Sequence, residues 1–399
     1  MKIGVCCFDD TDDAESGWAS VSGESAERVS GPSDLASNIL WVTNLPYFSH
    51  QKLNLRMSGN IFDDQYFRTK VSQIGIENGI ESDLKSLSEF CSGIFHKVVA
   101  MGAEHFGVDL SSPGYRYHKT MSYGLIPEHA RRQPEGRNSA EIMEAISHST
   151  QANQAMSGVK RPAGSSAISL VFPRQAYGKW MLELPLPVSS KWVTVKQKEN
   201  STKFGVEQGQ RLRNTSAVVE RLTSYGETNA MFLRTRVLSM EPFYRNFASF
   251  GSGEKIMRRW ATLPEVLELS RYAKISIEGG YMCPLGDHDL VPEDVFGESD
   301  MSYARGLLIE NVWAALASPV TVQSGAKRTV IEAYLRAYDR IACGRAAAHM
   351  ARRGFVVGSY SMGRVVVFLR PGEGEKVARA ALDIGLLPPM GYLNESEES

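Results

Sequence analysis

The sequence predicts a helix-rich α+β protein with a small central antiparallel sheet and a C-terminal helix–β-hairpin–helix unit. Three observations lead to this fold class. The composition, 43% hydrophobic and 22% charged over 399 residues, is that of a globular protein. Strand-like alternation and helical periodicity both occur, and no repeat of 20–50 residues is present. A chain of this length is expected to form two or three structural units.

Residues 1–37 are predicted to be an acidic N-terminal arm. Ile3 to Phe8 is compatible with a short strand, but the stretch from Asp9 to about Ser37 is acidic and rich in serine and glycine. Low hydrophobicity there favours an extended arm over a packed element.

Residues 38–126 are predicted to form a first helix-rich core, with Asn78-Gly79 as a turn. One helical face is indicated by the spacing of apolar residues at positions 84, 87, 90, 91, 94 and 95. Residues 127–164 are polar and contain several Arg, Lys and Pro residues, so they are predicted to be a connector with one short helix at Ala140–Ile146.

Residues 165–325 are predicted to be a central α+β region. Thr262 is the nearest candidate cap for a helix that begins at Pro264. The expected strands are 167–172, 180–184 and 191–196, and the expected helices are 216–222, 254–261 and 264–272.

Residues 326–399 carry the clearest pattern. Apolar residues recur at three- and four-residue steps from Lys327 to Arg352, which predicts a long helix that Gly354 ends. Two strand-like runs then flank Ser361-Met362-Gly363, a good hairpin turn. A final helix is expected over Glu373–Ile384, before an acidic tail.

Charge is strongly segregated along the chain, although the formal net charge is only −1. Residues 1–40 hold eight acidic and two basic residues, whereas residues 209–260 hold nine basic and four acidic ones. Six more acids lie between positions 287 and 300, with no Lys or Arg among them. Such segregation favours polyanions, copies of the same chain, or both as partners.

The sequence lacks the common catalytic motifs. It has no Gly-x-Ser-x-Gly elbow, no phosphate-binding Gly-x-x-x-x-Gly-Lys loop and no His-Glu-x-x-His pair. Asp9, Asp10, Asp12 and Asp13 follow a candidate strand and are typical of Mg²⁺ ligands, but a solvated acidic loop explains them better. Cys283 to Asp289 supplies at most three metal ligands. We therefore predict no catalytic residue, no bound metal and no cofactor, and five reduced cysteines.

Nucleic-acid binding is the better supported prediction. Tyr115 to Lys119 interleaves aromatic and basic side chains, and a similar mixture extends from Phe232 to Trp260. The alternative is that the aromatics are core and the arginines only solvate the surface. The candidate binding residues are Arg116, Lys119, Arg131, Arg132, Arg234, Arg236, Arg245, Arg258 and Arg259.

The leading hypothesis is a non-enzymatic, self-assembling protein that coats nucleic acid, RNA before DNA, as a viral capsid or nucleocapsid subunit does. One alternative is a subunit of an RNA-guided or RNA-processing complex. Another is a metal-dependent phosphotransfer enzyme that uses the Asp9–Asp13 cluster. No apolar run approaches the roughly 20 residues of a membrane span and no signal-peptide core is present, so a cytoplasmic or virion location is expected.

Overall fold

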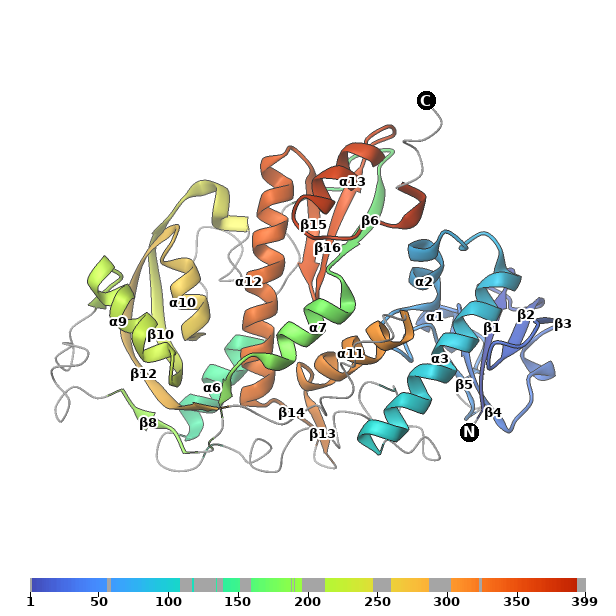
Figure 1. The fold of residues 1–399 in the computed structure, drawn as a ribbon, viewed down its shortest axis with the longest axis horizontal. Helices are drawn as coiled ribbons and strands as arrows, with labels where there is room; N and C mark the ends of the chain where they lie inside the picture. The colour runs from blue at the N-terminus through green and yellow to red at the C-terminus, as the bar shows by residue number, and fades with distance from the viewer. Residues whose placement is uncertain are drawn as a thin grey trace.

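The computed structural model describes residues 2–55, 59–107, 117, 134, 139–150, 159–187, 189, 191–195, 212–246, 260–286, 303–322 and 325–392. It confirms the predicted fold class, a mixed α+β protein rich in helix with several small sheets. Figure 1 shows three units along the long axis of the molecule. An N-terminal sheet lies at one end, the sheet of β10 and β12 at the other, and helix α12 between them.

The N-terminal unit is a five-stranded sheet with the order β3-β2-β1-β4-β5. β1 pairs antiparallel with β2 and parallel with β4. Its strands are β1 (Lys2–Phe8), β2 (Gly17–Val21), β3 (Glu27–Val29), β4 (Ile39–Thr43) and β5 (Ile61–Phe62). The interpretation of residues 1–37 as an extended arm is therefore wrong. Averaged hydrophobicity hides strands of three to five residues, because the acidic residues that dominate the average lie mainly in the turn between β1 and β2.

Both faces of this sheet are covered. Ile3, Val5 and Cys7 of β1 lie in the main core with α3 (Leu84–Phe106), whereas the opposite face packs on Trp41. A Cβ atom on Gly4 would lie 2.4 Å from the Trp41 ring, so only glycine fits there. The helical face predicted between residues 84 and 95 lies on α3, and its Cys91 and Phe95 are fully buried. The predicted turn at Asn78-Gly79 ends α2 (Val71–Asn78), with Gly79 in the left-handed conformation at φ 66°.

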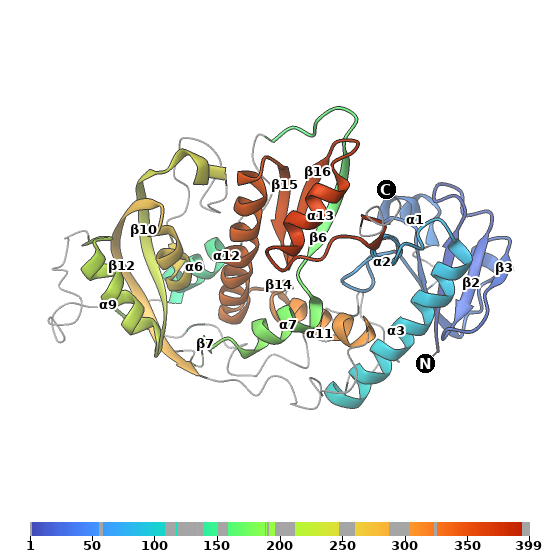
Figure 2. The same ribbon diagram turned by 45° about the horizontal axis from the view of Figure 1, so that its top comes forward.

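The central unit is assembled from two distant parts of the chain. Its sheet has the order β15-β16-β6, and every pairing is antiparallel. β6 (Ser166–Val171) thus belongs with β15 (Val356–Ser361) and β16 (Arg364–Leu369), although a domain boundary was predicted between them at residue 325/326. α12 (Val330–Arg352) and α13 (Gly374–Leu382) surround this sheet in Figures 1 and 2.

One buried carboxylate fixes the turn between β15 and β16. Met362 and Gly363 both have positive φ, 52° and 72°, as a two-residue type I′ hairpin turn requires. Their backbone N–H groups donate to Asp339 of α12 at 2.6 and 2.7 Å, and the Tyr177 hydroxyl donates to it at 2.8 Å. Asp339 has no exposed surface, so it replaces water as acceptor for a turn that points into the protein.

Tyr177 belongs to α7 (Arg174–Glu183), where a strand was predicted at residues 180–184. That prediction is wrong. Alternation over five residues does not distinguish the two structures, and the pair Tyr177 and Met181, one helical turn apart, is buried against α11 (Tyr303–Leu316).

The third unit is a six-stranded sheet in which β10 (Asn229–Met240) and β12 (Ala273–Gly286) pair over most of their length. Its other strands are β7 (Leu186–Pro187), β8 (Val193–Thr194), β9 (Leu212–Arg213) and β11 (Trp260–Thr262). α9 (Ser216–Gly226) and α10 (Leu263–Leu269) pack against one face through a separate apolar cluster. Thr262 caps α10 as predicted, in a capping box with Glu265.

One further predicted helix is confirmed, and another lies largely outside the described residues. The short helix expected at 140–146 lies within α6 (Ser139–Thr150). Most of the helix expected at 254–261 lies outside the described residues, and Trp260 and Ala261 belong to β11. All five cysteines are free and buried, and within the described ranges no helix is both long and apolar enough to span a bilayer.

Replacement of Asp339 by alanine should destabilise the fold, because it leaves two buried N–H groups without an acceptor. We expect the free energy of unfolding to fall by about 2–5 kcal/mol in urea titrations. Asp383→Ala is the control: Asp383 pairs with Arg353 at the surface, and its loss should change stability by about 0.5 kcal/mol or less. Equal effects of the two variants would contradict the role assigned to Asp339.

Candidate nucleic-acid interface

The two faces of the sheet around β10 differ in chemistry. Met231, Leu233 and Val237 point into the apolar cluster under α9 and α10. Because side chains alternate along a strand, Arg234 and Arg236 lie on the other face. The structure therefore places these two predicted residues together, on the sheet face away from α9 and α10.

Strand pairing adds a third arginine that the sequence did not indicate. Arg213 of β9 and Arg236 of β10 are both direct partners of Ser276 on β12, so the three residues form a row across the sheet on one face. Two strand spacings separate the arginines, about 10 Å between backbones. Lys274 is two residues from Ser276 and shares its face. We call Arg213, Arg236 and Lys274 the cation row.

All three side chains of the cation row are exposed, and among the described residues none of them forms an ion pair. Ser276 between the arginines is only 2% exposed, and its hydroxyl has no hydrogen-bond partner in the described part of the chain. Because the arginines lie within about one Debye length of each other, their potentials add. The three cations are therefore close together without an ion pair among the described residues, and Glu278 is the one acid on β12.

Arg234 is held by its neighbours. Its guanidinium lies 5.0 Å from the centroid of the Trp260 ring and donates to Glu141 of α6 at 3.4 Å. Tyr281 also donates to Glu141, at 2.9 Å. Arg234 thus joins α6 to the sheet, and it borders the cation row instead of belonging to it.

The remaining predicted residues divide into two groups. Arg245, in the 3₁₀ helix Pro242–Asn246, is exposed and has no partner among the described residues. The others lie outside the described residues: Arg116, Lys119, Arg131, Arg132, Arg258 and Arg259.

Three aromatic residues of the aromatic–basic pattern lie in the protein core. Tyr117, Phe232 and Trp260 are at most 2% exposed, and Tyr117 packs 5.1 Å from the Phe67 ring. These three rings are core, as the alternative interpretation of the aromatic–basic pattern expects, whereas Phe243 of the same pattern is 37% exposed. The three core rings cannot stack on bases in this structure.

The carboxylates of the acidic turn after β1 bind groups within the N-terminal unit. Asp9 accepts hydrogen bonds from Ser16 and Arg28, which lower the pKa of its carboxyl group. Asp10 and Asp13 accept from backbone N–H groups within the turn. Within the described residues, no three His, Cys, Asp or Glu side chains come together as metal ligands would.

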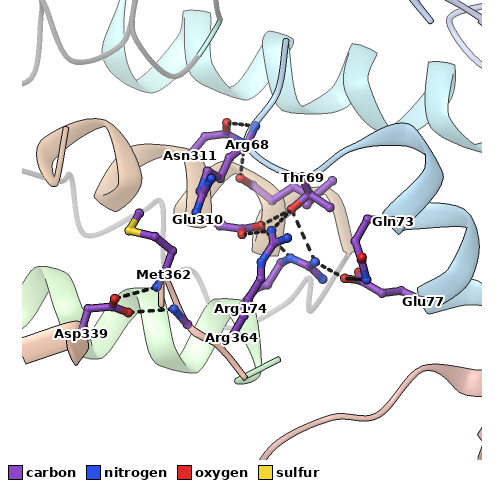
Figure 3. Close-up of polar contacts among 12 residues, drawn as sticks. Arg68, Thr69, Gln73, Glu77, Arg174, Glu310, Asn311, Asp339, Met362 and Arg364 are labelled. Atoms are coloured by element: carbon purple, nitrogen blue, oxygen red, sulfur yellow. Dashed lines mark hydrogen bonds and ion pairs between the residues drawn. The ribbon is translucent and has the colours of Figure 1, made fainter. Parts of the chain in front are cut away.

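A second polar cluster lies where the N-terminal and central units meet, and we call it the buried junction (Figure 3). Glu310 of α11 is its centre. Arg174 of α7 donates to Glu310 at 2.7 Å, Arg364 of β16 at 2.8 Å and Thr69, in the loop before α2, at 2.6 Å. Arg174 also donates to Glu77 of α2 at 2.6 Å.

The electrostatics of the buried junction favour a structural role. Burial alone would raise the pKa of Glu310, but the charges of Arg174 and Arg364 and the hydrogen bonds from Thr69 and Arg364 lower it well below its usual range. A carboxylate with so low a pKa binds protons weakly, so it is a poor general base near neutral pH. The adjoining cavity, about 10 Å³, has room for about one water molecule.

Comparison with known proteins leaves the chain without a family. No protein-family model matches it, and no curated protein matches it in sequence. Among solved structures it is similar to Phi29 DNA polymerase with primer-template DNA, at a TM-score of 0.44 and 10% identity, over 94% of this chain and 82% of that chain. The complex of that polymerase with single-stranded DNA gives a TM-score of 0.44 and 9% identity over the same shares. TM-scores below 0.5 do not establish a shared fold.

Replacement of Glu310 by glutamine should strongly destabilise the protein, because Arg364 would keep a buried charge without a carboxylate partner and Arg174 would retain only Glu77. We expect the free energy of unfolding to fall by about 3–5 kcal/mol. Glu375→Gln is the matched control, since Glu375 pairs with Arg379 at the surface and contributes about 1 kcal/mol or less.

Glu310→Gln should also change the way in which the free energy of unfolding depends on pH. Because the folded-state pKa of Glu310 is lowered, its stabilisation is present above the unfolded pKa near 4.3 and is lost as pH falls toward the folded value. Denaturant titrations between about pH 3 and 7 should therefore show a shallower acid dependence for Glu310→Gln than for the parent. Parallel pH profiles would contradict the assigned charge state.

Proposed function

We propose that this protein binds nucleic acid through the cation row. The observation that supports the proposal is the cross-strand placement of Arg213 and Arg236, exposed and without ion pairs among the described residues. Guanidinium groups bind phosphates through forked hydrogen bonds, and each bound phosphate releases condensed counterions. A few unpaired cations on one face thus attract a polyanion even though the whole chain has a formal net charge of −1.

Single-stranded RNA is the ligand that we propose in preference to DNA. Sheet faces bind single strands in several RNA-binding folds, whereas duplex DNA is usually read by an element that enters a groove. Phe232 and Trp260, on the strands next to the cation row, are buried, so recognition is proposed to act on the backbone and to have little sequence preference.

Two substitutions test this proposal. Arg213→Gln with Arg236→Gln should weaken binding to a single-stranded RNA in low-salt filter binding. It should also flatten the salt dependence by about 1.4 in log–log slope, because each lost phosphate contact removes about 0.7. Arg353→Gln with Arg379→Gln is the control, since both arginines already pair with acids at the surface. No binding at low salt, or the same loss in both double variants, would refute the cation row as the interface.

A second candidate function is self-assembly into a nucleic-acid coat, and the distribution of charge favours it. Asp10, Asp12 and Asp13 are exposed in the turn after β1, whereas the cation row belongs to the sheet at the opposite end of the molecule (Figure 1). Complementary surfaces at opposite ends support head-to-tail contacts, which produce rings or open filaments. The same interface also fits a subunit of an RNA-processing complex, the runner-up proposal.

Light scattering and electron microscopy at low salt test the assembly. The parent protein should form particles much larger than a monomer and carry nucleic acid, visible as a raised ratio of absorbance at 260 and 280 nm. Asp10→Asn with Asp12→Asn should reduce particle size, whereas Glu220→Gln with Glu227→Gln, on and beside α9, should not. A parent protein that stays monomeric with and without RNA would exclude the coat function.

A further inference from the structure

A pocket of about 440 Å³ lies between α10 and α12, at the end of the sheet where β10 ends and β12 begins. We call it the α10–α12 pocket. Its volume falls in the range of small-molecule sites and far exceeds what one bound ion needs. The charged residues that line it are Glu241, Glu265, Glu268, Arg271, Arg340, Arg345 and Arg352.

Most of these charges are already paired. Glu268 binds Arg345 at 2.5 Å and Arg271 at 3.4 Å. Glu265 binds Arg340 at 2.7 Å. Arg352 and Glu241 differ, since among the described residues neither of them forms an ion pair. The guanidinium of Arg352 instead lies 5.2 Å from the centroid of the Tyr244 ring and donates to the hydroxyl group of that ring.

Two further polar atoms at the pocket residues lack partners. Nη1 of Arg340 and Nε2 of His349 are buried, and neither has a hydrogen-bond partner in the described part of the chain. Arg340 is only 3% exposed, so this orphan donor is costly unless a ligand or water satisfies it. With four arginines against three glutamates the lining has one excess positive charge, which suits an anion.

The C-terminus of α12 does not oppose an anion as strongly as a bare helix end would. Its last carbonyl groups already accept hydrogen bonds: His349 and Met350 from the N–H of Arg353, and Ala351 from the N–H of Gly354. The negative end of the helix dipole, which resides on unpaired carbonyl groups, is thereby reduced. The positive charge of Arg352 in the last turn reduces it further.

The pocket also offers aromatic surface. The rings of Tyr244 and Tyr272 stack with centroids 4.2 Å apart and planes 9° apart, and both residues line the pocket. Aromatic rings next to a guanidinium are a common surface for a nucleobase and its phosphate. We propose that the α10–α12 pocket binds a nucleoside phosphate, either free or as the terminal nucleotide of a strand. This site is separate from the cation row and does not require it.

Calorimetric titration of AMP into the full-length protein at low salt tests the proposal, with adenosine and inorganic phosphate as comparison ligands. AMP should bind at least about tenfold more tightly than either, since each lacks one of the two recognised groups. Adenosine binding as tightly as AMP would refute phosphate recognition, and phosphate binding as tightly would refute recognition of the nucleoside. An oligoadenylate with a 5′-phosphate, compared with its 5′-hydroxyl form, distinguishes a strand end from a free nucleotide. If AMP does not bind and the 5′-phosphate does not increase the affinity for the oligoadenylate, the proposal fails.

Substitutions locate the binding in this pocket. Arg352→Ala should weaken AMP binding about tenfold or more. Arg352→Lys keeps the charge but loses the forked donors, so its AMP affinity should lie between those of Arg352→Ala and the parent. Arg353→Ala is the matched control, one residue away and paired with Asp383. Arg213→Gln with Arg236→Gln should leave AMP binding unchanged, so the proposals for the pocket and for the cation row are tested independently. Unchanged AMP affinity in a folded Arg352→Ala protein, checked by thermal melting, would overturn the assignment.

Discussion

The position of Glu310 constrains the rest of the structure. Its carboxylate is buried, so the fold can tolerate it only while Arg174 and Arg364 both remain within hydrogen-bond distance. Those arginines come from α7 and β16, and Thr69 comes from the N-terminal unit. One charge thus fixes three segments that are far apart in the sequence. Asp339 helps to position Arg364, because its carboxylate accepts hydrogen bonds from the turn at which β16 begins.

Local patterns in the sequence identified helices more reliably than strands. The periodicity between residues 327 and 352 and the cap at Thr262 depend on neighbouring residues, and α10 and α12 follow from them. β2 and β3 were missed because their stability comes from pairing between strands, which short runs of sequence do not record, whereas β1 was expected over Ile3 to Phe8. The strand expected at residues 180–184 fails for the related reason that five residues of alternation also fit a buried helix.

The candidate interface was predictable only in part. Arg236 could be singled out because it lies in a basic stretch, and alternation placed Arg234 on the same face of the strand. Arg213 belongs to a strand of only two residues, and its place beside Ser276 depends on a pairing across more than sixty positions of sequence. The acidic partners of Arg174 and Arg364 are also far from them in the sequence, so no spacing rule distinguishes these buried arginines from solvated ones. The acidic stretch at residues 1–40 and the described part of the basic stretch at residues 209–260 contribute to different sheets, so these two stay separate after folding (Figure 1).

The division of the central sheet between two distant segments has a consequence for synthesis on the ribosome. β6 is made long before β16, its only neighbour in the sheet order β15-β16-β6. At 5–20 residues per second, roughly 10–40 s pass between the two. During that interval the apolar side chains Ile168 and Leu170 have no sheet to cover them, and the backbone of β6 offers an open edge. The nascent chain therefore exposes an unpaired apolar strand while the sheet of β10 and β12 is being made.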